Sequence, residues 1–121
     1  MVLRHLTNHG RASEIPALGS ECAGEQGAFW QFHDARFQSG SSTVEGQIAL
    51  ARTLGLDVPR FTVCMEDERY QASLAEDRAA AQAYGVYIQP TFVISSGQER
   101  EALVGWRSAE ELSAIIDEYL N

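Results

Sequence analysis

The chain lacks lysine altogether, because all nine of its basic residues are arginine. Schiff-base chemistry, which needs a side-chain amine, is therefore excluded. No apolar run approaches the length of a membrane-spanning helix, so we expect no contact with a membrane. The segment Met1–His5 has no basic region followed by an apolar one, which argues against a signal peptide and for a cytoplasmic location. The net charge of −8 argues against nucleic acid as a partner.

Cysteine and histidine are also scarce. The two cysteines, Cys22 and Cys64, lie far apart and form no C-x-x-C pair. A structural zinc site usually needs a full set of Cys and His ligands. His5 and His9 stand four residues apart, but Gly10 follows at once and no acidic or Cys partner is near. We therefore expect no metal and no cofactor.

The first part of the chain predicts one strand and two helices. Val2–Leu6 alternates as a short strand does. A helix rich in small residues is expected over 12–23. Residues 28–38 carry aromatic side chains at helical spacing, which predicts a helix whose aromatics pack in the core.

Three further helices are indicated by their capping residues. Ser42 and Glu45 form the pattern of a capping box for a helix that runs through Leu54. Asp57 is placed to cap a helix over 58–65. Asp67 is expected to begin a third helix, which Gly85 ends. One set of charged residues is predicted to form its solvated face: Glu66, Asp67, Glu68, Glu76, Asp77 and Arg78.

The last part of the chain predicts a hairpin and a helix. Pro90 directly precedes Thr91–Ile94, a run typical of a buried strand. Gly97-Gln98 then separates this run from Ala102–Val104, which indicates an antiparallel hairpin. Ser108 with Glu111 is a second capping-box pattern. Four apolar positions predict the buried stripe of the final helix: Leu112, Ile115, Ile116 and Tyr119.

This order, with these residues, resembles the DsbA-like family of thioredoxin-fold proteins. The segment Glu21–Phe37 resembles the family pattern A-x-x-A-x-G-x-F-W-x-x-H-D-x-L-F, and Ala79–Phe92 resembles A-x-x-x-G-V-x-G-T-P-T-F. The resemblance implies one α/β domain over residues 1–121, a truncated thioredoxin-like fold of order β-[helices]-β-β-α. Its DsbA-type helical insertion covers about residues 12–84, and its hairpin and last helix cover about 86–120.

The resemblance also bears on function. The family's enzymes begin with a strand and a helix that bears a C-x-x-C motif, and that segment would precede Met1. We therefore expect a chain without thiol–disulfide oxidoreductase activity, not an enzyme by itself, that acts by binding or self-association. The alternative is a fragment of such an oxidoreductase, with its catalytic strand and helix encoded upstream or supplied by a partner. Acid–base catalysis by His33-Asp34 is a weaker alternative, because the family's motif accounts for both residues.

The resemblance implies site residues as well. The family's proline in this loop is cis, so Gln89, Pro90 and Thr91 are the candidate peptide- or partner-binding residues, although Ile88-Gln89 departs from the family's Gly-Thr. Some relatives have a disulfide between helices of the insertion, which leaves two alternatives for Cys22 and Cys64: a bridge or buried free thiols.

A missing central strand would leave unpaired backbone groups at the edge of the sheet. Three repairs are open. The strand Val2–Leu6 could pair directly with Thr91–Ile94, a second copy of the chain could supply the missing strand, or a separate partner could supply it. We expect a homodimer with exchanged strands or helices, and we keep a peptide or protein partner as an alternative.

Overall fold

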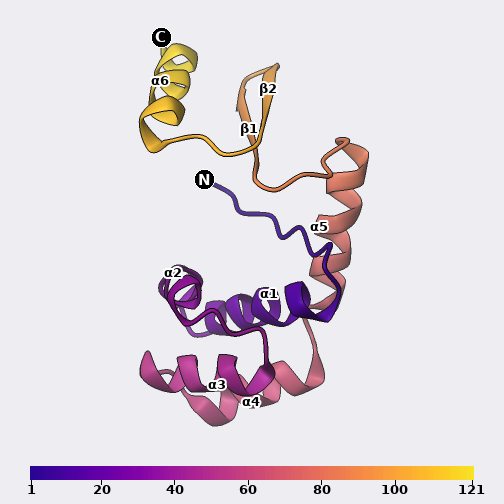
Figure 1. Cartoon of the computed structure of the whole chain (residues 1–121), viewed down its shortest axis with the longest axis vertical. Helices are drawn as coiled ribbons and strands as arrows, with labels where there is room; N and C mark the ends of the chain where they lie inside the picture. Colours follow the sequence, from indigo (N-terminus) through magenta and orange to yellow (C-terminus); the bar gives the residue numbers. More distant parts are fainter. The chain divides into compact units, whose positions relative to one another are not determined.

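A computed structural model describes all 121 residues of the chain. It is an α/β structure in which five helices are followed by a β-hairpin and a C-terminal helix (Figure 1). Two compact units are present, Met1–Ala80 and Ala81–Asn121. The predicted order of helices, hairpin and helix is confirmed, whereas the expectation of one domain over residues 1–121 stays a prediction.

The first unit is built from helices. They are α1 (Arg11–Gly24), α2 (Phe29–Ser39), α3 (Val44–Thr53), α4 (Val58–Asp67) and most of α5 (Gln71–Ala83). α1 packs against α2, α3 and α4, and α3 packs against α4 (Figure 1). The core lies where these helices meet, and its largest fully buried side chains are Phe32, Phe61, Leu18 and Leu74. Gly19 lets α1 pack closely against the Phe32 ring of α2, because a Cβ atom at Gly19 would lie only 3.0 Å from Cε1 of Phe32.

Side-chain caps explain where α3 and α4 begin, with one correction to the prediction. The side chain of Asp57 accepts a hydrogen bond from the backbone N–H of Arg60, as predicted for the start of α4. The cap of α3 is Thr43 rather than Ser42: its side chain accepts from the N–H of Gly46. The predicted capping box with Glu45 is therefore wrong by one residue. Ser41 supports this arrangement, since its hydroxyl bonds the Thr43 hydroxyl at 3.1 Å.

Three expectations for the helices are wrong. α5 begins at Gln71 and Asp67 instead ends α4. Asp77 is only 9% exposed and is not part of a solvated face. In α2 only Phe32 is buried, whereas Trp30 is 41% and Phe37 70% exposed. The aromatic positions of α2 spread around the helix, and only one side of the helix faces the core.

The predicted strand Val2–Leu6 is also wrong. The sheet has only two strands, and residues 1–8 form neither strand nor helix. A strand needs a neighbouring strand for its ladder of hydrogen bonds, whatever its alternation of side chains. Here the backbone N–H of His5 donates instead to Oδ2 of Asp77 at 3.0 Å, and Nη1 of Arg4 donates to Oδ1 at 3.0 Å. Asp77 therefore fixes the N-terminal segment to α5.

This anchor gives a testable prediction. Asp77→Ala should increase the hydrogen-exchange rate of the His5 amide about tenfold or more, since a buried hydrogen bond to a charged group is worth about 1.5–3 kcal/mol. Exchange measured by NMR checks it, and Glu76→Ala, which removes an exposed carboxylate from the same helix, is the matched control. Unchanged exchange at His5 in Asp77→Ala would show that another contact holds the segment.

The second unit contains β1 (Thr91–Ser96), β2 (Glu99–Val104) and α6 (Ala109–Leu120). The strands pair antiparallel with Thr91 opposite Val104 and Ser96 opposite Glu99, which confirms the hairpin. The Ser108–Glu111 capping box is present. α6 packs on β1, and the hydroxyl of Tyr119 donates to Glu101 at 3.2 Å. The predicted stripe of α6 is not fully buried, because Ile116 is exposed and the other three residues are half-buried.

Candidate functional site

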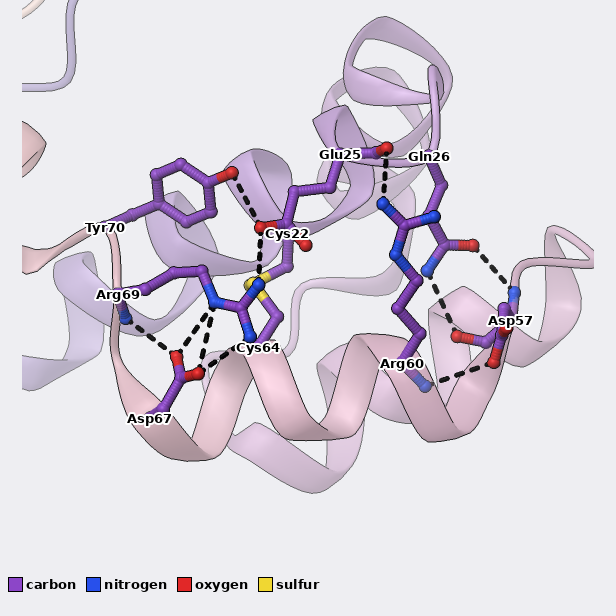
Figure 2. The surroundings of a disulfide bond; sticks show 9 residues. All are labelled: Cys22, Glu25, Gln26, Asp57, Arg60, Cys64, Asp67, Arg69 and Tyr70. Atoms are coloured by element: carbon purple, nitrogen blue, oxygen red, sulfur yellow. Dashed lines mark hydrogen bonds and ion pairs between the residues drawn. A yellow bond between two sulfur atoms is a disulfide. The ribbon is translucent and has the colours of Figure 1, made fainter.

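The two cysteines form a disulfide between α1 and α4. The Cα atoms of Cys22 and Cys64 lie 5.8 Å apart, and both residues are buried. The structure therefore has the bridged form of the two alternatives considered for these residues. Figure 2 shows the bond between the two helices, among charged residues that link the same elements.

Glu25 is the centre of those charged residues (Figure 2). Its Oε1 accepts a hydrogen bond from Nη1 of Arg69 at 2.9 Å and from the hydroxyl of Tyr70 at 2.9 Å. Arg69 also donates to Asp67, and this hydrogen bond lowers the pKa of the Asp67 carboxyl. Burial, followed by the hydrogen bond to Glu25, raises the pKa of Tyr70. These contacts hold the end of α1 to the segment between α4 and α5.

A second set of contacts braces the start of α4. The side-chain amide of Gln26 accepts from the N–H of Asp57 at 2.8 Å and donates to its carbonyl at 3.1 Å. Nη2 of Arg60 donates to the carbonyl of Glu25 at 3.1 Å. α4 is thus tied to α1 at both ends, with the disulfide between them (Figure 2).

This arrangement determines what the disulfide can do chemically. Thiol–disulfide exchange requires that a thiolate reach one of the sulfur atoms. Cys22 and Cys64 are each only 1% exposed. The disulfide therefore links helices rather than offering a reactive sulfur at the surface.

The predicted binding residues Gln89, Pro90 and Thr91 lie in the loop that enters β1. The Gln89–Pro90 peptide bond is cis. The carbonyl of Pro90 accepts a hydrogen bond from the N–H of Gly105 at 2.8 Å, and the hydroxyl of Thr91 donates to the carbonyl of Ile88 at 2.6 Å. Both ends of the hairpin are therefore joined at the base of this loop. The binding role of the three residues stays a prediction.

The hairpin has two unlike faces. Phe92 of β1 and Leu103 of β2 are opposite each other on one face, and Leu103 is buried. The other face, which we call the open face, carries Thr91, Val93, Ala102 and Val104, because side chains alternate along each strand. Val93 is 49% and Val104 53% exposed, so the expectation that Thr91–Ile94 forms a buried strand is wrong.

A hollow of about 120 Å³ adjoins the open face. Its lining includes Tyr84, Tyr87 and Ile88 from the segment before Pro90, together with Thr91, Ala102 and Val104. The sequence did not predict that Tyr84, Tyr87 and Ile88 line a hollow. The sequence feature that indicates this surface is the high density of large apolar side chains between Gly85 and Pro90, because a turn there exposes them to solvent.

Two further candidates were a metal site and acid–base catalysis by His33 and Asp34. No cluster of three or more His, Cys, Asp or Glu side chains is placed to hold a metal ion. Nδ1 of His33 lies 3.2 Å from Oδ1 of Asp34, but the His33 ring also stacks on Phe29 and meets Phe37 edge to face.

None of the helices combines the length and the apolar content that a membrane crossing requires.

Comparison with protein families and curated proteins gives matches over most of the chain. The family model of the DSBA-like thioredoxin domain matches residues 7–117. The Na⁺/H⁺ antiporter NhaA of Herminiimonas arsenicoxydans is 33% identical over 117 residues, which is 96% of this chain and 18% of that protein. NhaA 1 of Salinispora arenicola is 32% identical over 118 residues, with 95% and 18% covered. The chain thus spans about a fifth of the length of these relatives.

A solved structure has a similar fold. The crystal structure of a "putative protein disulfide isomerase" from Nitrosomonas europaea superposes with a TM-score of 0.70 at 21% identity. The match covers 89% of this chain and 57% of that chain. At this level of identity the likeness concerns the fold alone.

Proposed function

The chain belongs to the family of DSBA-like thioredoxin domains, and we propose that it acts by binding another polypeptide rather than by thiol–disulfide exchange. The sequence contains no C-x-x-C, and its two sulfur atoms are joined in a buried bond. The observation that carries the proposal is the uncharged edge strand β1, whose Val93 is exposed on the open face. An apolar hollow adjoins that face. Exposed apolar patches of this kind mark interaction sites.

The occupant we propose is a second copy of this chain. β2 carries Glu99, Arg100 and Glu101, and charged side chains are a common protection of sheet edges. β1, with the sequence TFVISS, has no charged residue. A two-stranded sheet by itself is marginal in water. Antiparallel pairing of two β1 edges would produce a four-stranded sheet with twofold symmetry, which supports β1 as the site of self-association.

Light scattering coupled to size exclusion, over a range of concentrations, tests the proposal. The wild-type chain should be a dimer, and Val93→Lys should shift it to a monomer, because a charge at an edge strand opposes pairing. Glu99→Lys changes the charge of the protected strand instead and should leave the dimer intact. A wild-type chain that is monomeric at every concentration, or an equal effect of both variants, contradicts pairing through β1.

The coverage of the relatives supports a second candidate function. Since the chain covers 57% of the Nitrosomonas europaea chain, a thiol–disulfide oxidoreductase could draw its C-x-x-C from outside residues 1–121. The nucleotide sequence before the Met1 codon distinguishes the two candidates. An in-frame strand, C-x-x-C and helix supports the oxidoreductase, whereas an in-frame stop codon supports the binding function.

We also propose that the bridged form arises in an oxidising compartment, in place of the cytoplasmic location expected from the sequence. Disulfides persist in oxidising compartments and are rare in the cytosol, where thiols are kept reduced. Trapping cell extracts with a maleimide under denaturing conditions tests this proposal. Full labelling of Cys22 and Cys64 without prior reduction would contradict it.

A further inference from the structure

One partly buried arginine of the helical unit has no counter-charge. Arg36, in the last turn of α2, has a buried Nε atom without a hydrogen-bond partner. Its guanidinium takes part in none of the ion pairs of the chain. The contact it does make is with the ring of Phe37, 5.1 Å from its carbon atom Cζ to the ring centroid. Burial lowers the pKa of Arg36, since desolvation disfavours the charged form.

Arg36 lines a hollow of about 270 Å³ that is formed by α1, the end of α2 and the loop before α3. Pro16 and Phe37 contribute apolar walls, and Ser41 and Ser42 contribute hydroxyl groups. The Ser41 hydroxyl is engaged with Thr43, whereas Ser42 is exposed. Although the chain has 17 acidic residues, none of them lines this hollow.

From these observations we infer that the hollow binds an organic carboxylate that bears an apolar group. Arginine presents a planar fork of donors that matches a carboxylate, and the Ser42 hydroxyl can add one more. The apolar walls would cover the rest of the ligand. A phosphate fits less well, because it needs several donors for its strongly hydrated oxygens and this hollow offers few.

Two sources share this chemistry: a free small acid, and the C-terminal carboxylate of a polypeptide that ends in an apolar residue. The site lies in residues 12–42, all in the helical unit, whereas the open face of the hairpin lies in the second unit. The inference does not depend on the proposed self-association.

Titration of the ¹⁵N-labelled chain tests the inference. The probes are 3-phenylpropionate, N-acetyl-Leu-Phe with a free C-terminus, and the same peptide with an amidated C-terminus. The two acids should shift the amide signals of Gly40, Ser41 and Ser42 with a Kd on the order of 1 mM, as expected for ligands of this size. The amidated peptide should shift them at least about tenfold more weakly, because it cannot pair with the arginine.

Variants make the assignment specific. Arg36→Gln should weaken binding of both acids about tenfold or more, whereas Arg52→Gln, on an exposed arginine of α3, should leave it unchanged. If Arg36→Gln loses its dispersed spectrum, Ser42→Ala replaces it and should weaken binding about threefold.

The outcomes separate the sources. Tighter binding of the peptide acid supports a polypeptide C-terminus, and tighter binding of 3-phenylpropionate supports a small acid. Equal shifts with the amidated peptide, unchanged binding in a folded Arg36→Gln, or no shift of the three amides overturns the inference.

Discussion

The variant Cys22→Ala/Cys64→Ala should have a free energy of unfolding about 4 kcal/mol lower than the oxidised wild-type chain, by the chain-entropy estimate. The two cysteines are 42 residues apart in sequence, so the bond closes a loop of substantial entropy in the unfolded chain. Urea denaturation followed by circular dichroism measures the effect, which corresponds to a midpoint lower by about 2 M.

Reductant provides the control for this prediction. It should destabilise the wild-type chain by a similar amount and leave the double variant unchanged, because that variant has no bond to reduce. A double variant as stable as the oxidised wild type would show that packing and the contacts of Gln26 and Arg60 hold α1 to α4 without the bond.

Phe32→Ala should lower the free energy of unfolding by about 3–5 kcal/mol, the usual cost of removing a fully buried aromatic ring. Phe32 is fully buried, and its ring centroid lies 5.5 Å from that of Phe61, which is buried as well. The backbone of α1 lies against this ring at Gly19, where a Cβ atom would be 3.0 Å from Cε1 of Phe32, so removing the ring leaves a cavity beside α1.

The matched control is Phe37→Ala, on the same helix and with the same chemical change. Phe37 is largely exposed, so its removal should change the free energy of unfolding by less than about 0.5 kcal/mol. Equal losses in the two variants would contradict the assignment of Phe32, rather than the whole aromatic set of α2, to the core.

The features predicted correctly from sequence are those in which neighbouring residues determine the outcome. Asp57 and Ser108 cap helices by bonding N–H groups three residues further on. Gly55 and Gly85 follow helix ends with positive φ angles of 73° and 68°, which glycine adopts readily. The turn at Gly97 joins two antiparallel strands, as predicted.

The wrong predictions concern features that depend on distant residues. Val2–Leu6 alternates like a strand, but its conformation is set by Asp77, about seventy residues away in sequence. The burial of Asp77 follows from the same contact and has no local signal. Helical spacing identified the aromatics of α2, but it does not say which side of the helix other helices will cover.

The candidate site was predictable only in part. The sequence singled out Gln89, Pro90, Thr91 and the two cysteines, and the structure gives the cysteines a bond. The sequence did not reveal the open face of the hairpin, because the exposure of Val93 and Val104 depends on what packs against the sheet. Arg36 was passed over as well, since nothing in its neighbours indicates that it lacks an anion.

The bond between α1 and α4 has a consequence for proteolysis. The exposed residues 38–40, at the end of α2, lie between the two cysteines in sequence, so a protease that cuts there leaves both fragments in one covalent molecule. The mass of that molecule rises by a single water. The two pieces separate on a gel only after reduction, so nicked and intact chains are indistinguishable under non-reducing electrophoresis.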